Sequence, residues 1–334
     1  MPFLPLFIQR FRTLHLPPPD SFASQTVIIT GANTGLGLET ARHIVSLGAS
    51  KVILGVRTLS KGVAAQSDIE ATTGRTGVIE VWEIDLESFA SVKAFTRRAA
   101  SLERLDVAIM NAGLASTQWH ISDEGFERQI QVNVLSTALL MLLLIPILVR
   151  SRREHPSSKP HLTVLGIDSH MDAKFEERHS ENILETLNDK IMWEETSSNP
   201  AERYSVSKLL VQYVVDAVAR LTPKIGGEPA VIVDIVAPGF CKSNLREDGD
   251  VFILKVLQFL MGRTNAERAK CVVDGAIRGP EAHGQYLDHQ KIASVGTLVR
   301  SEEGSKLQEK IWEEILEVLL PVAPEIECTI YGDV

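Results

Sequence analysis

Short apolar runs rich in β-branched residues alternate along this chain with longer segments whose apolar residues recur at helical spacing. Helices are expected from about Gly35 to Leu47 and around Val92, Val134 and Leu210. We predict strands at Thr26 to Thr30, Lys51 to Gly55, Val78 to Ile84, Asp106 to Met110, His161 to Gly166, Ala230 to Val236 and Gln285 to Asp288. Because strands joined by helical crossovers pair in parallel, the pattern predicts an α/β fold with one doubly wound parallel sheet of about seven strands.

The strand-forming pattern occupies residues 24 to 290, which we predict to be a single domain. Residues 1 to 23 are interpreted as an N-terminal leader, and residues 291 to 334 as a C-terminal helical extension. Two polar segments inside the domain, Ser151 to Lys159 and Met171 to Pro200, are expected to be loops or short surface helices.

Three apolar stretches raise the question of membrane contact. Met1 to Ile8 is too short for a signal peptide, and the residues after it are not the small ones of a cleavage site. Val134 to Val149 is shorter than the roughly 20 residues that cross a bilayer, so we predict a buried helix and no transmembrane span. Val251 to Met261 is predicted to be an amphipathic helix that covers a substrate pocket, with peripheral lipid contact as the alternative.

Composition narrows the class of protein. The chain has 334 residues, of which 44% are hydrophobic and 23% charged, as in an ordinary globular protein. Its formal net charge of -9 argues against nucleic-acid binding. Cys241, Cys271 and Cys328 are scattered and lack the spacing of a zinc site or a disulfide framework. We therefore expect no metal and a reducing, cytoplasmic location.

A glycine-rich loop, Thr-Gly-Ala-Asn-Thr-Gly-Leu-Gly from residue 30 to residue 37, follows the first predicted strand. Gly31 permits a tight turn, Gly35 lets the backbone approach a diphosphate, and Gly37 lets the next helix pack closely on the sheet. The start of that helix then faces the anion. The loop thus predicts a dinucleotide site.

Tyr204 and Lys208 stand four residues apart in Tyr-Ser-Val-Ser-Lys, a spacing that places both side chains on one face of a helix. A phenol with a pKa of about 10 is a poor acid-base catalyst at neutral pH, and a nearby ammonium lowers that pKa. Together with the glycine loop, this pair indicates hydride-transfer chemistry.

With these motifs the chain resembles the short-chain dehydrogenase/reductase family, whose main subgroup carries Thr-Gly-x-x-x-Gly-x-Gly and Tyr-x-x-x-Lys. The resemblance covers roughly Ser24 to Asp288 and implies a Rossmann-type fold. Further family marks follow in order, namely Asp85, Asn111-Ala112-Gly113, Asn133 and Pro238-Gly239.

The resemblance also implies roles for individual residues. Tyr204 would exchange a proton with the substrate, Lys208 would bind the nicotinamide ribose, and Asn133 would hold a water that links Lys208 to solvent. Asp85 would contact adenine. The cofactor would be bound by Gly31, Asn33, Thr34, Gly35, Leu36, Gly37, Asp85, Asn111, Ala112, Gly113, Tyr204, Lys208, Pro238, Gly239 and Ser243.

The end of the second strand bears on the choice of cofactor. An acidic residue there would bind the adenosine ribose hydroxyls and favour NAD(H), but the chain reads Gly55-Val56-Arg57. Arg57 can pair with a 2′-phosphate and stack on adenine, so we predict NADP(H).

The chain departs from the family at the catalytic serine. Aligned without a gap, Ile167 falls on the serine position and Ser169 lies two residues later. A bulged loop would bring Ser169 back to the site, and we take it as the candidate. Asp168 or His170 could substitute, since the loss of one hydrogen bond to the developing oxyanion costs roughly 10²- to 10³-fold in rate.

These residues predict an NADP(H)-dependent oxidoreductase acting on a ketone, aldehyde or alcohol. The cover region from residue 241 to residue 270 is apolar in places, which indicates a bulky apolar substrate. The amino-acid sequence of these motifs resembles that of fungal members of the retinol-dehydrogenase-like branch. This resemblance implies a role in secondary-metabolite biosynthesis. The alternative is a catalytically impaired NADP(H)-binding regulatory or scaffold protein. A homodimer through the apolar helix around Leu139 to Leu148 is one interpretation of this helix, and burial inside one chain explains it equally well.

Overall fold

The computed structural model describes residues 13 to 196, 202 to 239 and 263 to 332. Three features of the sequence therefore lie outside the described residues: Ser243, Cys241 and the amphipathic segment from residue 251 to residue 261. So does most of the predicted cover region.

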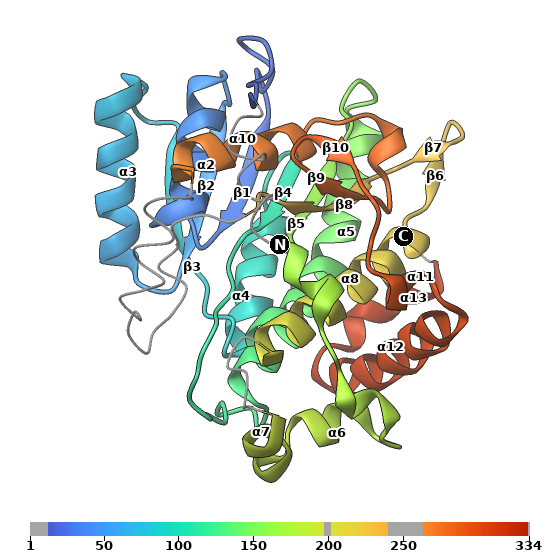
Figure 1. The fold of residues 1–334 in the computed structure, drawn as a ribbon. Helices are drawn as coiled ribbons and strands as arrows, with labels where there is room; N and C mark the ends of the chain where they lie inside the picture. The colour runs from blue at the N-terminus through green and yellow to red at the C-terminus, as the bar shows by residue number, and fades with distance from the viewer. Residues whose placement is uncertain (1–12, 197–201, 240–262, 333–334) are drawn as a thin grey trace.

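An eight-stranded sheet in the order β10-β9-β8-β5-β4-β1-β2-β3 forms the centre of the molecule (Figure 1). The edge strand β10 pairs antiparallel with β9, and all the other neighbours pair in parallel. The sheet strands are β1 (Thr26–Thr30), β2 (Lys51–Val56), β3 (Ile79–Glu83), β4 (Val107–Met110), β5 (His161–Leu165), β8 (Ile232–Ala237), β9 (Tyr286–Asp288) and β10 (Lys291–Ile292). The seven predicted parallel strands are confirmed, each within two residues of its expected bounds.

Three short strands were not expected from the sequence. They are β10 and the separate hairpin of β6 (Lys224–Ile225) and β7 (Glu228–Pro229). Each has two residues, which is too short to show the alternation that marks a strand.

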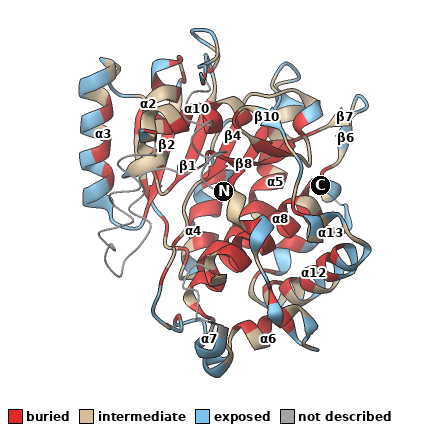
Figure 2. Cartoon of the chain, in the orientation of Figure 1, coloured by how far each residue is buried: buried red, intermediate tan, exposed pale blue. Residues whose placement is uncertain are grey.

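Helices cover both faces of the sheet (Figure 1). On one face lie α2 (Gly35–Ser46), α3 (Leu59–Thr73) and α10 (Asn265–Gly275). On the other lie α4 (Phe89–Ala100), α5 (Ser136–Glu154) and α8 (Glu202–Leu221). In β1, Ile28 belongs to the core under α4, α5 and α8, whereas Val27 and Ile29 belong to the core under α2, α3 and α10. Figure 2 shows the resulting buried centre of the sheet and of the helix faces that contact it.

Short helices fill the long connection between β5 and α8 and the chain after β10. The connection contains η2 (Asp168–Asp172), η3 (Glu176–His179), α6 (Ile183–Leu187) and α7 (Lys190–Thr196). Between α10 and β9 lies η4 (Pro280–Ala282), and the C-terminal elements are α11 (Thr297–Arg300), α12 (Glu302–Val322), η5 (Pro324–Ile326) and α13 (Glu327–Tyr331).

The described part of the N-terminal segment packs against the domain. Leu14 is buried in a small core with β8, β9 and α10, and Phe22 is buried beneath α2. The side chain of Gln290, in the turn after β9, accepts from His15 N at 2.9 Å and donates to His15 O at 2.6 Å.

The apolar helix α5 is buried inside this one chain. It continues a π-helical turn, η1 (Ile130–Leu135), and the combined helix is long and apolar enough to cross a membrane, but 89% of its most apolar window is buried in the protein. It packs between α4 and α8, and η5 and α13 cover it from outside. None of the residues from 139 to 148 is exposed. Burial within the monomer therefore accounts for the apolar stretch.

Pro146 explains one contact between α5 and the C-terminal segment. Proline lacks an N–H, so the carbonyl of Leu142, four residues earlier, loses its donor within the helix. The hydroxyl of Thr329 in α13 donates to Leu142 O at 3.0 Å and replaces that donor. Thr329 is itself buried.

Replacing Thr329 with Val should lower the free energy of unfolding by about 1 to 2 kcal/mol, because a buried carbonyl would lose its partner. Urea unfolding of the full chain measures this change, and Thr329→Ser, which keeps the hydroxyl, is the control. A Val variant as stable as the parent protein would show that the contact does not hold α13 on α5.

Candidate active site

The glycine loop is held against the end of β4. Gly31 adopts a positive φ of 65°, and the amide of Asn111 donates to Thr30 O at 2.8 Å and to Gly31 O at 3.2 Å. A Cβ atom on Gly37 would lie 2.4 Å from Asn111 Nδ2. Gly37 is therefore required for the close approach of α2, and Asn111 fixes the loop backbone through its side chain. Ala112 N donates to the Thr30 hydroxyl at 3.0 Å, which ties the next residue to the same loop.

The loop leaves room for a diphosphate beside Gly35. Gly35 has a φ of 60°, and the nearest atom to a Cβ placed there is Asn265 Nδ2, at 3.9 Å. Asn33 and Thr34 precede it, and Leu36 lies in the first turn of α2. An uncrowded backbone at the start of a helix suits a phosphate group. The residues present thus fit the dinucleotide predicted from the sequence.

Arg57 follows β2, the strand next to β1, and Asp85 follows β3, one strand further along the sheet. Arg57 Nη1 donates to Glu87 at 2.9 Å, and Asp85 Oδ1 accepts from Glu87 N at 3.0 Å. Arg128 Nη2 also donates to Glu87, at 2.6 Å. A 2′-phosphate would therefore compete with Glu87 for the guanidinium of Arg57.

Tyr204 and Lys208 lie in the first half of α8, where the spacing predicted them. Lys208 is buried, and its Nζ donates to Leu165 O at the end of β5, at 2.8 Å. The same nitrogen is 5.9 Å from the centre of the Tyr204 ring. Burial lowers the pKa of Lys208 to about 8. The two side chains thus share one helical face directed at the carboxyl end of the sheet.

Asn133 lies in the π-helical turn η1 and is fully engaged. Its Oδ1 accepts from Leu114 N at 2.9 Å, and its Nδ2 donates to Leu114 O at 2.9 Å and to Ser207 Oγ at 3.0 Å. A Cβ atom on Gly113 would lie 3.1 Å from Asn133 Oδ1 and 3.6 Å from Lys208 Nζ. The side-chain amide of Asn133 and the ammonium of Lys208 therefore both lie beside Gly113. π-helical turns occur frequently at functional sites.

The loop after β5 brings Ser169 to α8. Ser169 Oγ lies 2.9 Å from the hydroxyl of Ser205, the residue after Tyr204, and Ile167 lies in extended backbone before η2. Neighbouring residues on a helix do not share a face. The role of Ser169 as the substrate-polarising hydroxyl therefore stays a prediction. The residues on either side of Ser169 hold the loop in place. Tyr286 donates to Asp168 at 2.6 Å, and His170 Nδ1 bonds to Ile167 O.

The turn after β8 contains Pro238 and Gly239, the latter with a φ of 73°. Pro238 O accepts from Nη1 of Arg268, a buried residue of α10. Sequence reasoning did not single out Arg268.

Two buried carboxylates lie near Arg203 at the start of α8. Arg203 lies 3.3 Å from the carboxylate of Glu177, and Glu127 accepts from the backbone N–H groups of Gln129 and Ile130 at 3.1 and 3.2 Å. Burial raises the pKa of Glu127 and lowers that of Arg203. The ion pair with Glu177 holds the start of α8 against η3, and the attraction between the charges of Arg203 and Glu127 acts between α8 and the residues just before η1.

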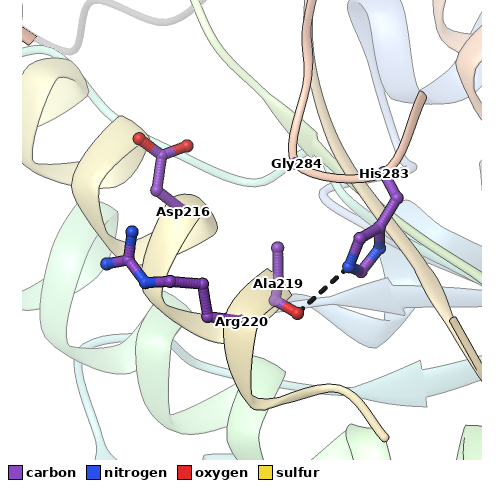
Figure 3. Close-up of a pocket in the computed structure, with 5 residues that line it drawn as sticks. All are labelled: Asp216, Ala219, Arg220, His283 and Gly284. Carbon is purple, nitrogen blue, oxygen red and sulfur yellow. Dashed lines mark hydrogen bonds between the residues drawn. The ribbon is translucent and has the colours of Figure 1, made fainter. Parts of the chain in front are cut away.

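A cavity of about 310 Å³ lies elsewhere, between the second half of α8 and the loop before β9 (Figure 3). Its lining residues are Asp216, Ala219, Arg220, His283 and Gly284. Burial raises the pKa of Asp216 to about 6, and His283 Nε2 donates to Ala219 O at 3.1 Å. Asp216 is roughly two helical turns beyond Lys208, so this cavity is separate from the site around Tyr204.

Comparison with known proteins decides the family. Residues 25 to 155 match the family model described as short chain dehydrogenase. The chain is 35% identical over 325 residues to the short chain dehydrogenase/reductase dmxR8 of Cryptosporiopsis sp. (strain 8999), covering 96% of this chain and 98% of that protein. The chain belongs to the short-chain dehydrogenase/reductase family. It is also 38% identical over 275 residues to the short chain dehydrogenase atnD of Emericella nidulans, covering 81% and 85% of the two chains.

Solved structures support the fold of this short-chain dehydrogenase/reductase. A short chain dehydrogenase of Escherichia coli CFT073, complexed with NADPH, matches with a TM-score of 0.56 and 20% identity over 82% of this chain and all of that one. Menthone neomenthol reductase from Mentha piperita matches with a TM-score of 0.59 and 18% identity over 80% of this chain and 99% of that one.

Several contact residues of this dehydrogenase/reductase escaped the sequence analysis. Ser207 accepts from Asn133 and donates to Tyr204 O at 2.8 Å, and it lies inside the Tyr-x-x-x-Lys motif, which is the signal that could have identified it. Thr30 is the first residue of the glycine loop, so that motif could have identified it as well. Arg268 lies in the predicted cover region but belongs to no motif, and it gave no such signal.

Proposed function

We propose that this short-chain dehydrogenase/reductase transfers hydride between NADP(H) and a ketone, aldehyde or alcohol carbon of a bulky apolar small molecule. The observation that carries the proposal is the placement of Lys208 and Tyr204 on one face of α8, with the ammonium of Lys208 buried beside Gly113 and Asn133. The bound cofactor would supply the hydride in reduction and accept it in oxidation. Fungal relatives and the sequence of the motifs support a role in secondary-metabolite biosynthesis. We place the protein in the cytoplasm because its three scattered cysteines fit a reducing compartment.

Each residue has a defined task in this proposal. Tyr204 donates its phenolic proton to the substrate oxygen during reduction and recovers it during oxidation. Lys208 stabilises the phenolate and binds the nicotinamide ribose, while Asn133 fixes the backbone at Leu114 and the hydroxyl of Ser207. Gly31, Gly35 and Gly37 admit the diphosphate.

The test is NADPH oxidation, followed by absorbance, with the full-length protein and a panel of apolar ketones and aldehydes. Steady oxidation that depends on both the carbonyl compound and the protein is the expected result. Tight NADPH binding without turnover of any carbonyl or alcohol would favour a cofactor-binding regulatory protein instead. Ile167 at the family's serine position is the observation behind that alternative.

Cofactor preference depends on Arg57. Arg57→Ala should weaken NADPH binding about tenfold, because the variant loses the pairing with the 2′-phosphate. NADH binding should weaken less, because NADH can lose only the stacking on adenine. The effect on NADPH is modest since Arg57 is half exposed. Fluorescence titration with both cofactors measures the ratio. Glu87→Gln is the matched variant and should tighten NADPH binding, because it removes the carboxylate that pairs with Arg57. Equal weakening for NADPH and NADH would contradict the assignment.

A further inference from the structure

A buried arginine in α10 fixes the turn after β8. Arg268 is 2% exposed, its Nη1 donates to Pro238 O, and the same nitrogen lies 3.0 Å from Nε2 of His289. A Cβ atom on Gly239 would lie 2.3 Å from Arg268 Nη1. The turn and the guanidinium are thus fitted to each other, since any side chain at residue 239 would displace the arginine.

His289 is held in position by an unusual hairpin turn. The β9–β10 hairpin closes with the two residues His289 and Gln290, whose φ angles are 49° and 62°, in the left-handed region that Gly and Asn usually occupy. His289 Nδ1 bonds to the carboxylate of Asp288. Because a guanidinium can only donate, Nε2 of His289 accepts from Arg268 and Nδ1 carries the proton toward Asp288. A continuous chain of hydrogen bonds therefore runs from Asp288 to Pro238.

The same helix contacts the glycine loop at the other end of the dinucleotide site. Asn265 Nδ2, in the first turn of α10, lies 3.9 Å from a Cβ placed on Gly35. The ring of His43 in α2 bonds to Ala266 O at 2.8 Å. The first turn of α10 therefore lies near the diphosphate loop and bonds to the helix that follows it, while Arg268 holds the turn after β8.

We propose that Arg268, supported by His289 and Asp288, is a positioning residue that sets the Pro238–Gly239 turn for the nicotinamide half of the cofactor. The inference rests on the proposed function, because it presumes that this turn borders the nicotinamide. Arg268 acts through the turn and does not touch the reacting atoms. It therefore controls how the nicotinamide end is held and leaves the adenosine end unaffected.

The test compares two ligands on the full-length protein. NADPH spans the whole site, whereas 2′-phospho-ADP-ribose lacks the nicotinamide. Arg268→Met should weaken NADPH binding roughly tenfold, as expected for the loss of a charge-assisted contact, and leave binding of the fragment within twofold. Arg268→Lys should recover part of the loss. Lys270→Met, two residues along α10, is the matched control and should change neither affinity, because Lys270 bonds to Glu267 and Leu14 O.

The outcomes separate this inference from the proposed function. Equal weakening for NADPH and the fragment, or unchanged NADPH binding, would overturn the positioning role of Arg268 alone. Failure of the unmodified protein to bind NADPH would overturn the proposed function as well. If Arg268→Met does not fold, His289→Asn is the second variant. It removes the imidazole from the same chain of hydrogen bonds, and asparagine tolerates the positive φ at this position. Binding of NADPH and of the fragment to this variant then tests the inference in the same way.

Discussion

Replacing Tyr204 with Phe is expected to lower kcat/KM by about 10²- to 10⁴-fold, because the variant lacks the hydroxyl that exchanges a proton with the substrate. The affinity for NADPH should stay within a few-fold, since the ring remains in place on α8. Steady-state NADPH oxidation and a fluorescence titration on the same preparation measure the two quantities.

Tyr213 in the same helix provides a matched control. Its phenol is buried with no hydrogen-bond partner for the oxygen among the described residues, and burial raises its pKa to a strongly basic value. Tyr213→Phe should therefore keep full activity. If Tyr204→Phe were as active as Tyr213→Phe, Tyr204 would not be the proton donor.

Replacing Lys208 with Met should have a similarly large effect on turnover, about 10²-fold or more, because the phenolate of Tyr204 would lose its neighbouring positive charge. Lys208→Arg keeps a charge and is the comparison. Its activity should lie between those of the parent protein and the Met variant. Unchanged kcat in Lys208→Met would remove Lys208 from the mechanism.

The same Met variant should be more stable than the parent protein without cofactor. Burial lowers the pKa of Lys208 to about 8 from the ordinary value of 10.5, so charging it at neutral pH costs stability. We expect a gain of roughly 1 to 3 kcal/mol in the free energy of unfolding below pH 8, reduced by the lost bond to Leu165 O. Above pH 8 the folded protein sheds the proton while the unfolded chain keeps it until about pH 10.5. The parent protein therefore gains stability over that range and the difference disappears. A gain that is constant with pH would contradict this account.

The parallel sheet could be predicted from the sequence because its strands are buried on both faces. Val27, Ile28 and Ile29 in β1 serve two different cores, so the strand is continuously apolar and easy to recognise. The two-residue strands and the positive-φ turn at His289 depend on tertiary contacts instead. Those contacts leave no periodic pattern in the sequence.

The site was predictable where the chemistry is local. Tyr204 and Lys208 share a helical face through their spacing alone. The position of Ser169 could not be deduced, because its hydroxyl meets Ser205 through a loop whose course depends on the contact between Asp168 and Tyr286. Arg268 was missed for the same reason, since its partners lie 21 and 30 residues away in sequence.

Direct titration of the unmodified protein with NADPH, followed by nicotinamide fluorescence, tests the central claim most directly. The account predicts saturable binding of one NADPH per chain, with weaker binding of NADH and loss of the signal on addition of a reducible apolar ketone. The absence of saturable binding of either cofactor would contradict it.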